Sequence, residues 1–428
     1  MVDVRFDSPS RPLFEAHCRR VAALALETAT CLGLPAEEKH ILEQAALLHH
    51  NSRELLAPEV LARLMRDLAG PTGQALVSEG TPAGFAARGP QAVLEALHHR
   101  PATALHPRIS TLTEILEIAN FFDERLQFLP YELVTVEQIL DELGWMVQEG
   151  FYRPAIVTVL ASFPRIPKER LLEKVHRLPV FPVVALKVLE LASDQDASFL
   201  EMERLVSRDQ VLAGRILQAA NSGLYNPSGR IASIRQAISY IGLEVTRKVL
   251  MVVVFQPLFA SAGLHLLWKH SLEIAELAER LTAFINCNPA GQAFLAGLVH
   301  DVGRLALLMS SGEDVIAYQR LLDRGCEPVF AEMVLCGFDH GAAGADILRW
   351  WSFPEHLTEA VERHHQPEHS DSELASILYL AEFWAGSKED LESAARLHHA
   401  LKRTGIPLDL LEQPATPASA LIHLLAAA

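Results

Sequence analysis

Histidines and carboxylates recur on apolar stretches of the C-terminal half of this chain, and these residue types suit a metal ion. His300 and Asp301 are neighbours inside the run LAGLVHDVGRLALL, where buried polar groups cost free energy unless something satisfies them. Imidazole nitrogens suit Fe, Mn, Zn or Ni, and the two oxygens of Asp301 could bridge two ions. Ions held this way would polarise a phosphoryl oxygen and deliver hydroxide at neutral pH. We refer to these seven residues as the C-terminal set: His270, His300, Asp301, His340, His364, His365 and Glu382.

Each histidine of the set, taken singly, is more often a core residue bonded to a backbone carbonyl, and the sequence leaves that alternative open. Spacing along the chain does not by itself bring the seven residues together. The expectation that they converge rests instead on an internal repeat.

The repeat consists of four landmarks that occur in the same order in both halves of the chain. A histidine opens an apolar helical face, a second ends an apolar run, a His-His pair follows, and a polar residue closes a third apolar face. The landmarks are His17, His49, His98-His99 and Asn120 in the first half, and His270, His300, His364-His365 and Glu382 in the second. The sequence therefore predicts two copies of one helical unit.

The first copy lacks the acidic ligands. His50 stands where the second copy has Asp301, and Asn120 stands where it has Glu382. Since a site without a carboxylate holds a hard divalent ion poorly, we expect no metal in this half. It would serve instead as scaffold, interface or ligand pocket.

The elements that must position these residues are predicted to be helices throughout, because apolar positions recur at helical spacing and strict alternation is rare. The fold class is therefore all-α. Capping boxes are predicted at Ser198-x-x-Glu201 and Ser233-x-x-Gln236, and helix stops at Gly33, Gly223 and Gly242.

Four prolines between residues 162 and 182 predict a domain boundary, since each biases the preceding residue away from helix. We expect a first domain at 1–165 and a second at 166–428. The second divides into a helical subregion without counterpart in the first half, a metal-site subregion and C-terminal helices, at 171–258, 259–396 and 397–428.

Composition excludes several partners. The 428 residues carry 37 Lys and Arg against 53 Asp and Glu, a net charge of −16, which repels nucleic acid and anionic lipid. The longest apolar run, VLMVVVF, is far shorter than a membrane span. The N-terminus lacks the apolar segment of a signal peptide, and the five cysteines form no Cys-x-x-Cys pair. We expect a cytoplasmic protein with reduced thiols.

Residues 171 to about 370 resemble an HDOD domain, a regulatory relative of HD phosphohydrolases found in bacterial signalling proteins. The matching stretches include LPVFPVVALKVLELASDQDAS, LVSRDQVLAGRILQAANSGLYN, FLAGLVHDVGRLALL and FDHGAAGADILRWWSFPEHLTEAVERHHQP. The resemblance implies a helical bundle in two subregions and a role in regulation, usually without catalysis.

Residues 1–165 resemble a degenerate HD-GYP domain, the phosphodiesterase class that acts on cyclic di-GMP. The matching stretches include HCRRVAALALETATCLGL, AALLHH and ILEIANFFDERLQFLPYELVTVEQILDEL. His50 replaces the Asp of the HD pair, Asn120 replaces the later ligand Asp, and the Gly-Tyr-Pro signature is missing.

The resemblance also implies roles for the C-terminal set, which HDOD domains generally lose and this chain keeps. By the family pattern, one ion would be held by His270, His300, Asp301 and Glu382. Asp301 would bridge to a second ion held by His340 and His364, with His365. Glu382 stands in place of the expected Asp, and Arg304 in place of a frequent Lys, which is a different kind of cation.

Three hypotheses follow. The first is a bacterial signalling scaffold without physiological catalysis, which binds a protein partner or an effector and uses the C-terminal set as a structural metal site. The second is a metal-dependent phosphohydrolase acting on a nucleotide or phosphoester, with Asp301 and Arg304 as its catalytic residues. The third is a helical bundle without an ion.

Overall fold

The structure is a computed structural model that describes most of the chain. The described residues are 11–49, 107–127, 134–163, 189–191, 197–225, 229–259, 264–285, 290–308, 313–386, 394–413 and 415. Of the residues singled out above, His50, His98 and His99 lie outside these ranges, as does most of the proline-rich segment.

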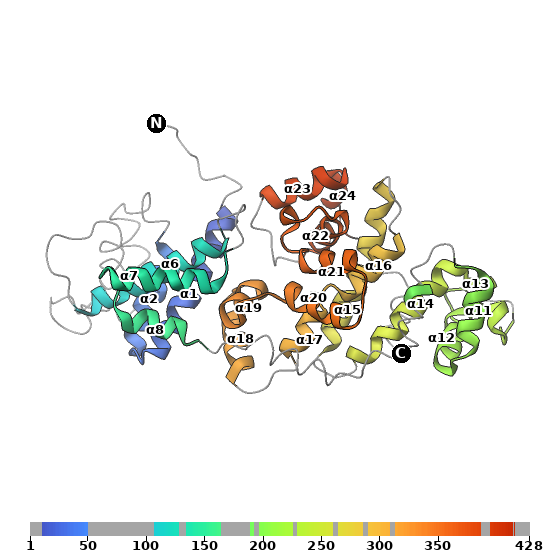
Figure 1. The fold of residues 1–428 in the computed structure, drawn as a ribbon, viewed down its shortest axis with the longest axis horizontal. Coiled ribbons are helices and arrows are strands. Elements are labelled where there is room, and N and C mark those ends of the chain that lie inside the picture. The colour runs from blue at the N-terminus through green and yellow to red at the C-terminus, as the bar shows by residue number, and fades with distance from the viewer. Residues whose placement is uncertain are drawn as a thin grey trace, which may run out of the picture. The chain divides into compact units, whose positions relative to one another are not determined.

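The all-α prediction is confirmed: the described ranges contain nineteen α-helices and no strand (Figure 1). The capping box at Ser198 is present in full, because its side chain accepts from the Glu201 backbone N–H and Glu201 bonds back to it. At Ser233 the structure shows the bond from the Gln236 backbone N–H. Gly242 ends its helix with φ of 85°.

Contacts divide the chain into two compact units, which we describe separately. The N-terminal unit comprises Met1–Arg165 and Ile316–Gly337, and the C-terminal unit comprises Ile166–Val315 and Phe338–Ala428.

The N-terminal unit is a bundle around one apolar core. Its helices are α1 (Arg11–Cys31), α2 (Ala36–Leu48), α6 (Pro107–Gln127), α7 (Val136–Gln148), α8 (Pro154–Ala161), α18 (Glu313–Asp323) and α19 (Pro328–Cys336). Leu24 of α1, Leu42 of α2 and Leu116 of α6 are fully buried in this core.

Helices α18 and α19 join this core although they follow Asp301 in the chain. Leu321 and Phe330 are buried in the same cluster as Leu24. Arg320 and Arg324 both form ion pairs with Glu27 of α1, at 2.6 and 2.7 Å. The expected second domain was continuous over 166–428, and the structure differs because the apolar faces of these two helices complete the core of the other unit.

Within the described part of the C-terminal unit, four helices precede the C-terminal set: α11 (Phe199–Ser207), α12 (Gln210–Ala220), α13 (Ile234–Ile241) and α14 (Leu243–Phe255). The helices that follow surround the C-terminal set: α15 (His265–Leu281), α16 (Ala290–Val299), α17 (Val302–Leu308), α20 (His340–Trp350), α21 (Glu355–Glu362) and α22 (Glu373–Ala385). The unit closes with α23 (Ala394–Thr404) and α24 (Leu408–Leu411).

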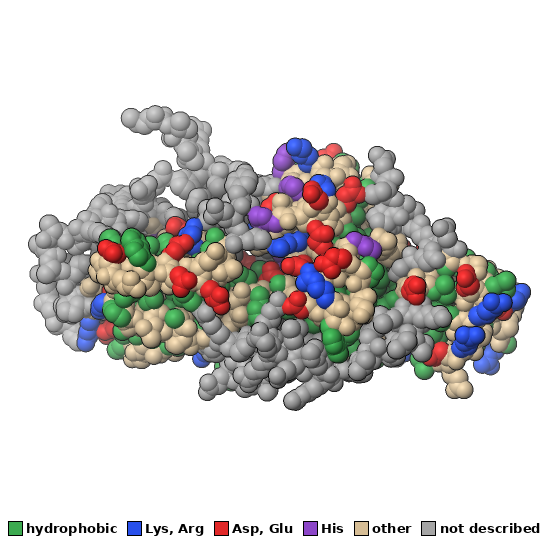
Figure 2. Space-filling model, viewed as in Figure 1, with side chains coloured by type: hydrophobic (Ala, Val, Ile, Leu, Met, Phe, Trp, Pro, Cys, Tyr) green, Lys and Arg blue, Asp and Glu red, His purple; other side chains and the backbone are tan. Residues whose placement is uncertain are grey.

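Charge is unevenly spread over the surface. Figure 2 shows basic side chains gathered over α11 to α13, in a chain whose net charge is −16. Among the helices that the structure describes, none combines the length and apolar character needed to cross a bilayer.

Candidate metal centre

The C-terminal set converges, although its members come from five separate parts of the chain. His270 lies on α15, and Glu382 lies on α22, which packs against it. His300 and Asp301 occupy the turn between α16 and α17, His340 begins α20, and His364 and His365 follow α21. Three subsets bring ligand atoms within 4.8 Å of one another: His270, His300 and Glu382; His300, Asp301 and His364; and His340, His364 and His365.

Asp301 lies at the centre of the set. Its Oδ1 is 3.4 Å from His300 Nε2 and 3.0 Å from His340 Nε2, and its Oδ2 is 3.7 Å from His270 Nε2. Glu382 Oε1 is 2.9 Å from His270 Nε2 and 2.8 Å from His300 Nε2. Asp301 therefore reaches histidines on both sides, as a bridging carboxylate must.

The ends of two helices orient two of the imidazoles. His300 Nδ1 donates to the Gly297 carbonyl at 2.7 Å, and His364 Nδ1 donates to the Val361 carbonyl at 2.6 Å. These carbonyls belong to last helical turns, where intrahelical donors run out. Since a neutral imidazole carries one N–H, the bond at Nδ1 leaves the Nε2 lone pair directed into the set.

Two glycines let the helices approach closely enough to bring these ligands together. A Cβ on Gly303 would lie 2.0 Å from the His340 carbonyl oxygen, and a Cβ on Gly297 would lie 2.6 Å from Ala275 Cα. Gly303 thus sets the approach of α17 to α20, and Gly297 the approach of α16 to α15. Both belong to the run that contains His300 and Asp301.

Burial and charge act against each other at the rim of the set. Burial disfavours the charged form of His270, but Glu382 and then Asp301 outweigh it and raise the pKa of this imidazole to about 9. Burial alone would raise the pKa of Glu382, yet His270 and His300 hold it well below its usual range. Both carboxylates are therefore ionised at neutral pH, because the pKa of Asp301 is likewise held down, against burial, by Arg304, His300 and His340.

His364 is neutral for a different reason. It is buried, and burial together with the charges of His365 and His340 holds its pKa well below the usual range. A neutral imidazole is the form that binds metal. The Nε2 atom of His364 is buried and has no hydrogen-bond partner within the described residues, and the same holds for Glu382 Oε2. Such orphaned atoms are costly unless an ion satisfies them, so the donor set fits a pair of divalent ions.

Arg304 lies beside the set. Its Nη1 is 3.1 Å from Asp301 Oδ2, and its Nε is 3.4 Å from His340 Nδ1. The side chain is 13% exposed, whereas that of Asp301 is 1% exposed. Arg304 therefore connects the buried carboxylate to the edge of the site.

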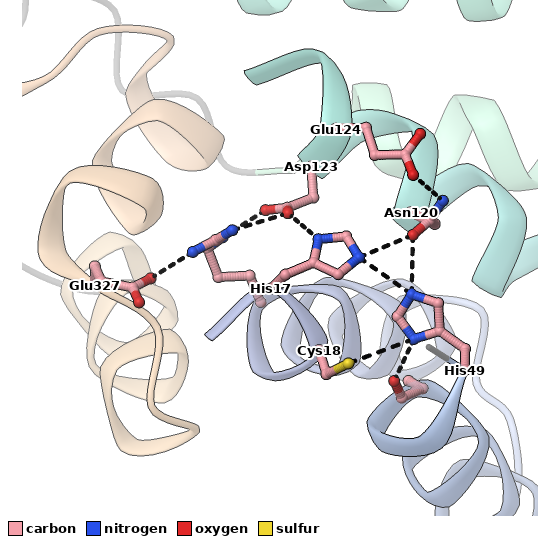
Figure 3. Close-up of polar contacts among 9 residues, drawn as sticks. His17, Cys18, His49, Asn120, Asp123, Glu124 and Glu327 are labelled. Atoms are coloured by element: carbon pink, nitrogen blue, oxygen red, sulfur yellow. Dashed lines mark hydrogen bonds and ion pairs between the residues drawn. The ribbon is translucent and has the colours of Figure 1, made fainter. Parts of the chain in front are cut away.

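A second polar cluster lies in the N-terminal unit, at the corresponding landmarks (Figure 3). His17 Nε2 faces His49 Nε2 at 3.2 Å, and Asn120 Oδ1 lies 3.1 and 2.9 Å from these two atoms. The repeat thus brings His17, His49 and Asn120 together, as predicted. His50, the counterpart of Asp301, is outside the described residues.

Sequence reasoning missed three residues of this second cluster. Asp123 accepts from His17 Nδ1 at 2.6 Å and pairs with Arg20 through two bonds of 2.6 and 3.0 Å. Arg20 Nη1 also lies 3.5 Å from Oε2 of Glu327, the residue that precedes α19. Helical spacing could have revealed two of them, because Arg20 follows His17, and Asp123 follows Asn120, by one turn. Glu327 carried no such signal.

Comparison with known proteins identifies a family for the C-terminal unit. The family model described as HDOD domain matches residues 178–367. A protein of Treponema pallidum (strain Nichols), described only as uncharacterized, is 20% identical over 215 residues. The match covers 49% of this chain and 42% of that protein, so the chain spans less than half the length of this curated relative.

Two solved structures align with part of this chain. A phosphohydrolase candidate from Shewanella amazonensis SB2B is 22% identical, with a TM-score of 0.48 over 60% of this chain and 97% of that one. An HDOD domain protein of unknown function from Geobacter sulfurreducens is 26% identical, with a TM-score of 0.47 over 60% of this chain and 87% of that one. The likeness of residues 1–165 to HD-GYP domains stays a prediction. Residues 178–367 of this chain are an HDOD domain.

Proposed function

We propose that the C-terminal unit is a metal-dependent phosphohydrolase that acts on a phosphoester within a signalling pathway. The observation that carries the proposal is the convergence of five imidazoles and two ionised carboxylates around Asp301, with buried ligand atoms that lack hydrogen-bond partners among the described residues. A pure helical bundle would bury these groups together for no gain in stability.

The chain's own residues divide into two ligand groups that share Asp301. His270, His300 and Glu382 would hold one ion with Asp301, and His340, His364 and His365 would hold the other. Bound ions would polarise a phosphoryl oxygen and provide a nucleophile at neutral pH. The helix-end bonds of His300 and His364 fix the imidazoles before any ion arrives.

Arg304 is the candidate phosphate-binding residue. Its guanidinium pairs with Asp301 at the edge of the set, and its planar fork matches two phosphate oxygens. A bound phosphoester would compete with Asp301 for this cation, and the ions would then balance the charge of Asp301.

The first experiment measures metal content by elemental mass spectrometry on untagged protein purified without chelator, together with hydrolysis of bis(p-nitrophenyl) phosphate. Wild type is compared with Asp301→Ala, His300→Ala and the control His356→Ala, which alters an exposed histidine of α21. We expect Fe, Mn, Zn or Ni and activity in wild type and His356→Ala, and the loss of both in the other two variants. Absence of metal from wild type after anaerobic reconstitution would contradict the proposal.

A regulatory scaffold is the second candidate, and the depth of the set favours it. His300, Asp301, His340 and His364 are each at most 1% exposed, which suits a structural ion. Leu200 of α11 and Val211 of α12 are exposed. Figure 2 shows basic side chains over these helices, where an acidic protein partner would fit. Bound metal without turnover on any phosphoester, together with a large loss of stability on chelation, would favour this function.

A further inference from the structure

Two helices, one in each unit, expose rows of side chains that complement each other in charge and apolar character. We propose that α7 of one molecule docks antiparallel on α11 of a second copy of this chain. The inference rests on the regulatory-scaffold function and deepens it, because it names a partner for the basic surface of the C-terminal unit. It does not depend on the phosphohydrolase.

The row on α7 is acidic and ends in an aromatic side chain. Glu137, Asp141 and Trp145 follow one another at intervals of four residues, so they lie along one face of the helix. All three side chains are exposed, and Trp145 is 55% exposed. Neither acid forms an ion pair with any residue that the structure describes. The α7 row therefore offers two unpaired negative charges beside an apolar surface.

A second aromatic ring widens the apolar end of this row. Gly150 turns the chain after α7 with a φ of 79°, and the Phe151 N–H then donates to the Met146 carbonyl at 2.9 Å. The turn places the ring centroids of Phe151 and Trp145 6.4 Å apart, and Phe151 stays 59% exposed. Large aromatic side chains held at the surface in this way are typical of interfaces.

The row on α11 has the same spacing and the opposite charge. Leu200, Arg204 and Arg208 follow at intervals of four residues, the last with helical backbone angles at the C-cap, and all three are exposed. Neither arginine has an ion-pair partner in the described part of the chain. Residues 197–259 contain seven Arg and Lys against four Asp and Glu, and Figure 2 shows basic side chains over these helices. The row therefore suits an acidic partner.

The two rows match in an antiparallel orientation. Each spans eight residues of helix, about 12 Å, so the two rows stay in register along their length. The parallel orientation would place Glu137 against Leu200 and keep one ion pair instead of two. The facing pairs of the antiparallel contact are Trp145 with Leu200, Asp141 with Arg204, and Glu137 with Arg208.

The apolar pair and the ion pairs contribute differently to this contact. A tryptophan that loses its water against an aliphatic side chain is typical of a binding hot spot, so Trp145 on Leu200 provides most of the affinity. Exposed ion pairs add little affinity, but they select the orientation and speed the encounter. Since the two surfaces of the contact differ, each can be altered without altering the other.

The test measures self-association of the full chain by analytical ultracentrifugation, over a roughly 100-fold range of protein concentration. We expect wild type to associate at low salt and to associate more weakly at ~1 M salt, where the ion pairs are screened. Trp145→Ala should weaken association at least ~30-fold, as expected for a tryptophan hot spot.

Charge reversal tests the two rows separately. Arg204→Glu with Arg208→Glu forms one variant, and Glu137→Lys with Asp141→Lys forms the other. Each variant alone places like charges in every contact and should stay monomeric. A one-to-one mixture should associate again, because each variant keeps the row that the other has lost. The control Arg230→Glu alters an exposed arginine outside the row and should change self-association less than ~3-fold.

Circular dichroism shows whether each variant is folded. Wild type that stays monomeric at every concentration in low salt would overturn the proposal and leave the basic row to a different protein. Oligomers that persist in either charge-reversed variant would overturn it too, since another surface would then join the copies. A mixture of the two folded variants that stays monomeric would do the same. None of these measurements depends on metal content, turnover or chelation, so failure of the proposal is distinguishable from failure of either proposed function.

Discussion

The two histidine clusters share one structural device and differ in where they place negative charge. His49 and His300 each follow a helix and donate Nδ1 to the carbonyl three residues earlier, at 2.6 and 2.7 Å. In the C-terminal unit, Asp301 and Glu382 stand among the imidazoles. In the N-terminal unit, Asp123 stands behind His17 and is neutralised by Arg20. Helix ends can thus hold an imidazole array independently of the carboxylates that determine its chemistry.

The largest effect should come from removing the central carboxylate. Asp301→Ala should lower phosphoesterase kcat/KM by about 1,000-fold, which corresponds to ~4 kcal/mol of transition-state stabilisation. Asn120→Ala, at the N-terminal cluster, should change this activity less than twofold. Steady-state kinetics on bis(p-nitrophenyl) phosphate check both values. Equal losses in the two variants would show that the clusters do not differ in the way proposed.

The buried ion pair of the N-terminal cluster should dominate the stability of its unit. Arg20→Met leaves Asp123 buried without its cation, and breaking a buried pair in this way costs roughly 3–5 kcal/mol. The control Arg108→Met removes a pair to Glu38 whose arginine is 55% exposed, for a loss of less than about 1 kcal/mol. Urea unfolding, with hydrogen exchange in α1 and α6, measures both. A small effect of Arg20→Met would mean that Asp123 is satisfied without it.

The close approach of α17 to α20 at Gly303 predicts an effect of intermediate size. Gly303→Ala places a methyl group against the His340 carbonyl, so it should destabilise the unit by about 1–3 kcal/mol and weaken metal binding. Gly214→Ala on α12 has nothing within 4 Å and should stabilise its helix by about 0.5–1 kcal/mol. Thermal unfolding and metal titration compare the two. Unchanged metal affinity in Gly303→Ala would show that the close approach of α17 to α20 does not determine the geometry of the metal site.

The smallest expected effect is on the pH dependence of stability in acid. The pKa of Asp123 is lower in the folded chain than in the unfolded chain, so its contribution to stability is complete above about pH 4. It is lost as the pH falls through the lowered folded pKa, with a slope of at most ~1.4 kcal/mol per pH unit. Unfolding free energies between pH 5 and 2.5 should fall more steeply in wild type than in Asp123→Asn, because Asp301 and Glu382 contribute equally to both. An identical pH dependence would contradict the assignment.

Sequence predicted the helical class and the convergence of the C-terminal set, and it did so for a physical reason. Residues such as His270 and Glu382 lie at matching landmarks of a repeat. Two copies of one unit fold alike, so residues at matching landmarks are expected to have the same neighbours in space. Asp123 and Arg20 were missed because Ala385 and Glu273 occupy the corresponding positions of the second copy, so the repeat carried no signal. Helices α18 and α19 were assigned to the second domain because they follow Asp301 in the chain, and an apolar helix face does not by itself indicate which core it joins.

Because α18 and α19 pack in the core of the N-terminal unit, the order of synthesis affects when that unit can fold. The core that surrounds Leu24 and Leu42 also needs Leu321 and Phe330, which the ribosome adds almost three hundred residues later. During translation, residues 1–165 therefore keep part of their apolar surface exposed until residues 316–337 have been synthesised, after much of the second unit. A fragment ending at residue 165 should aggregate, and any attempt to express the first unit alone should include residues 316–337 through an artificial linker.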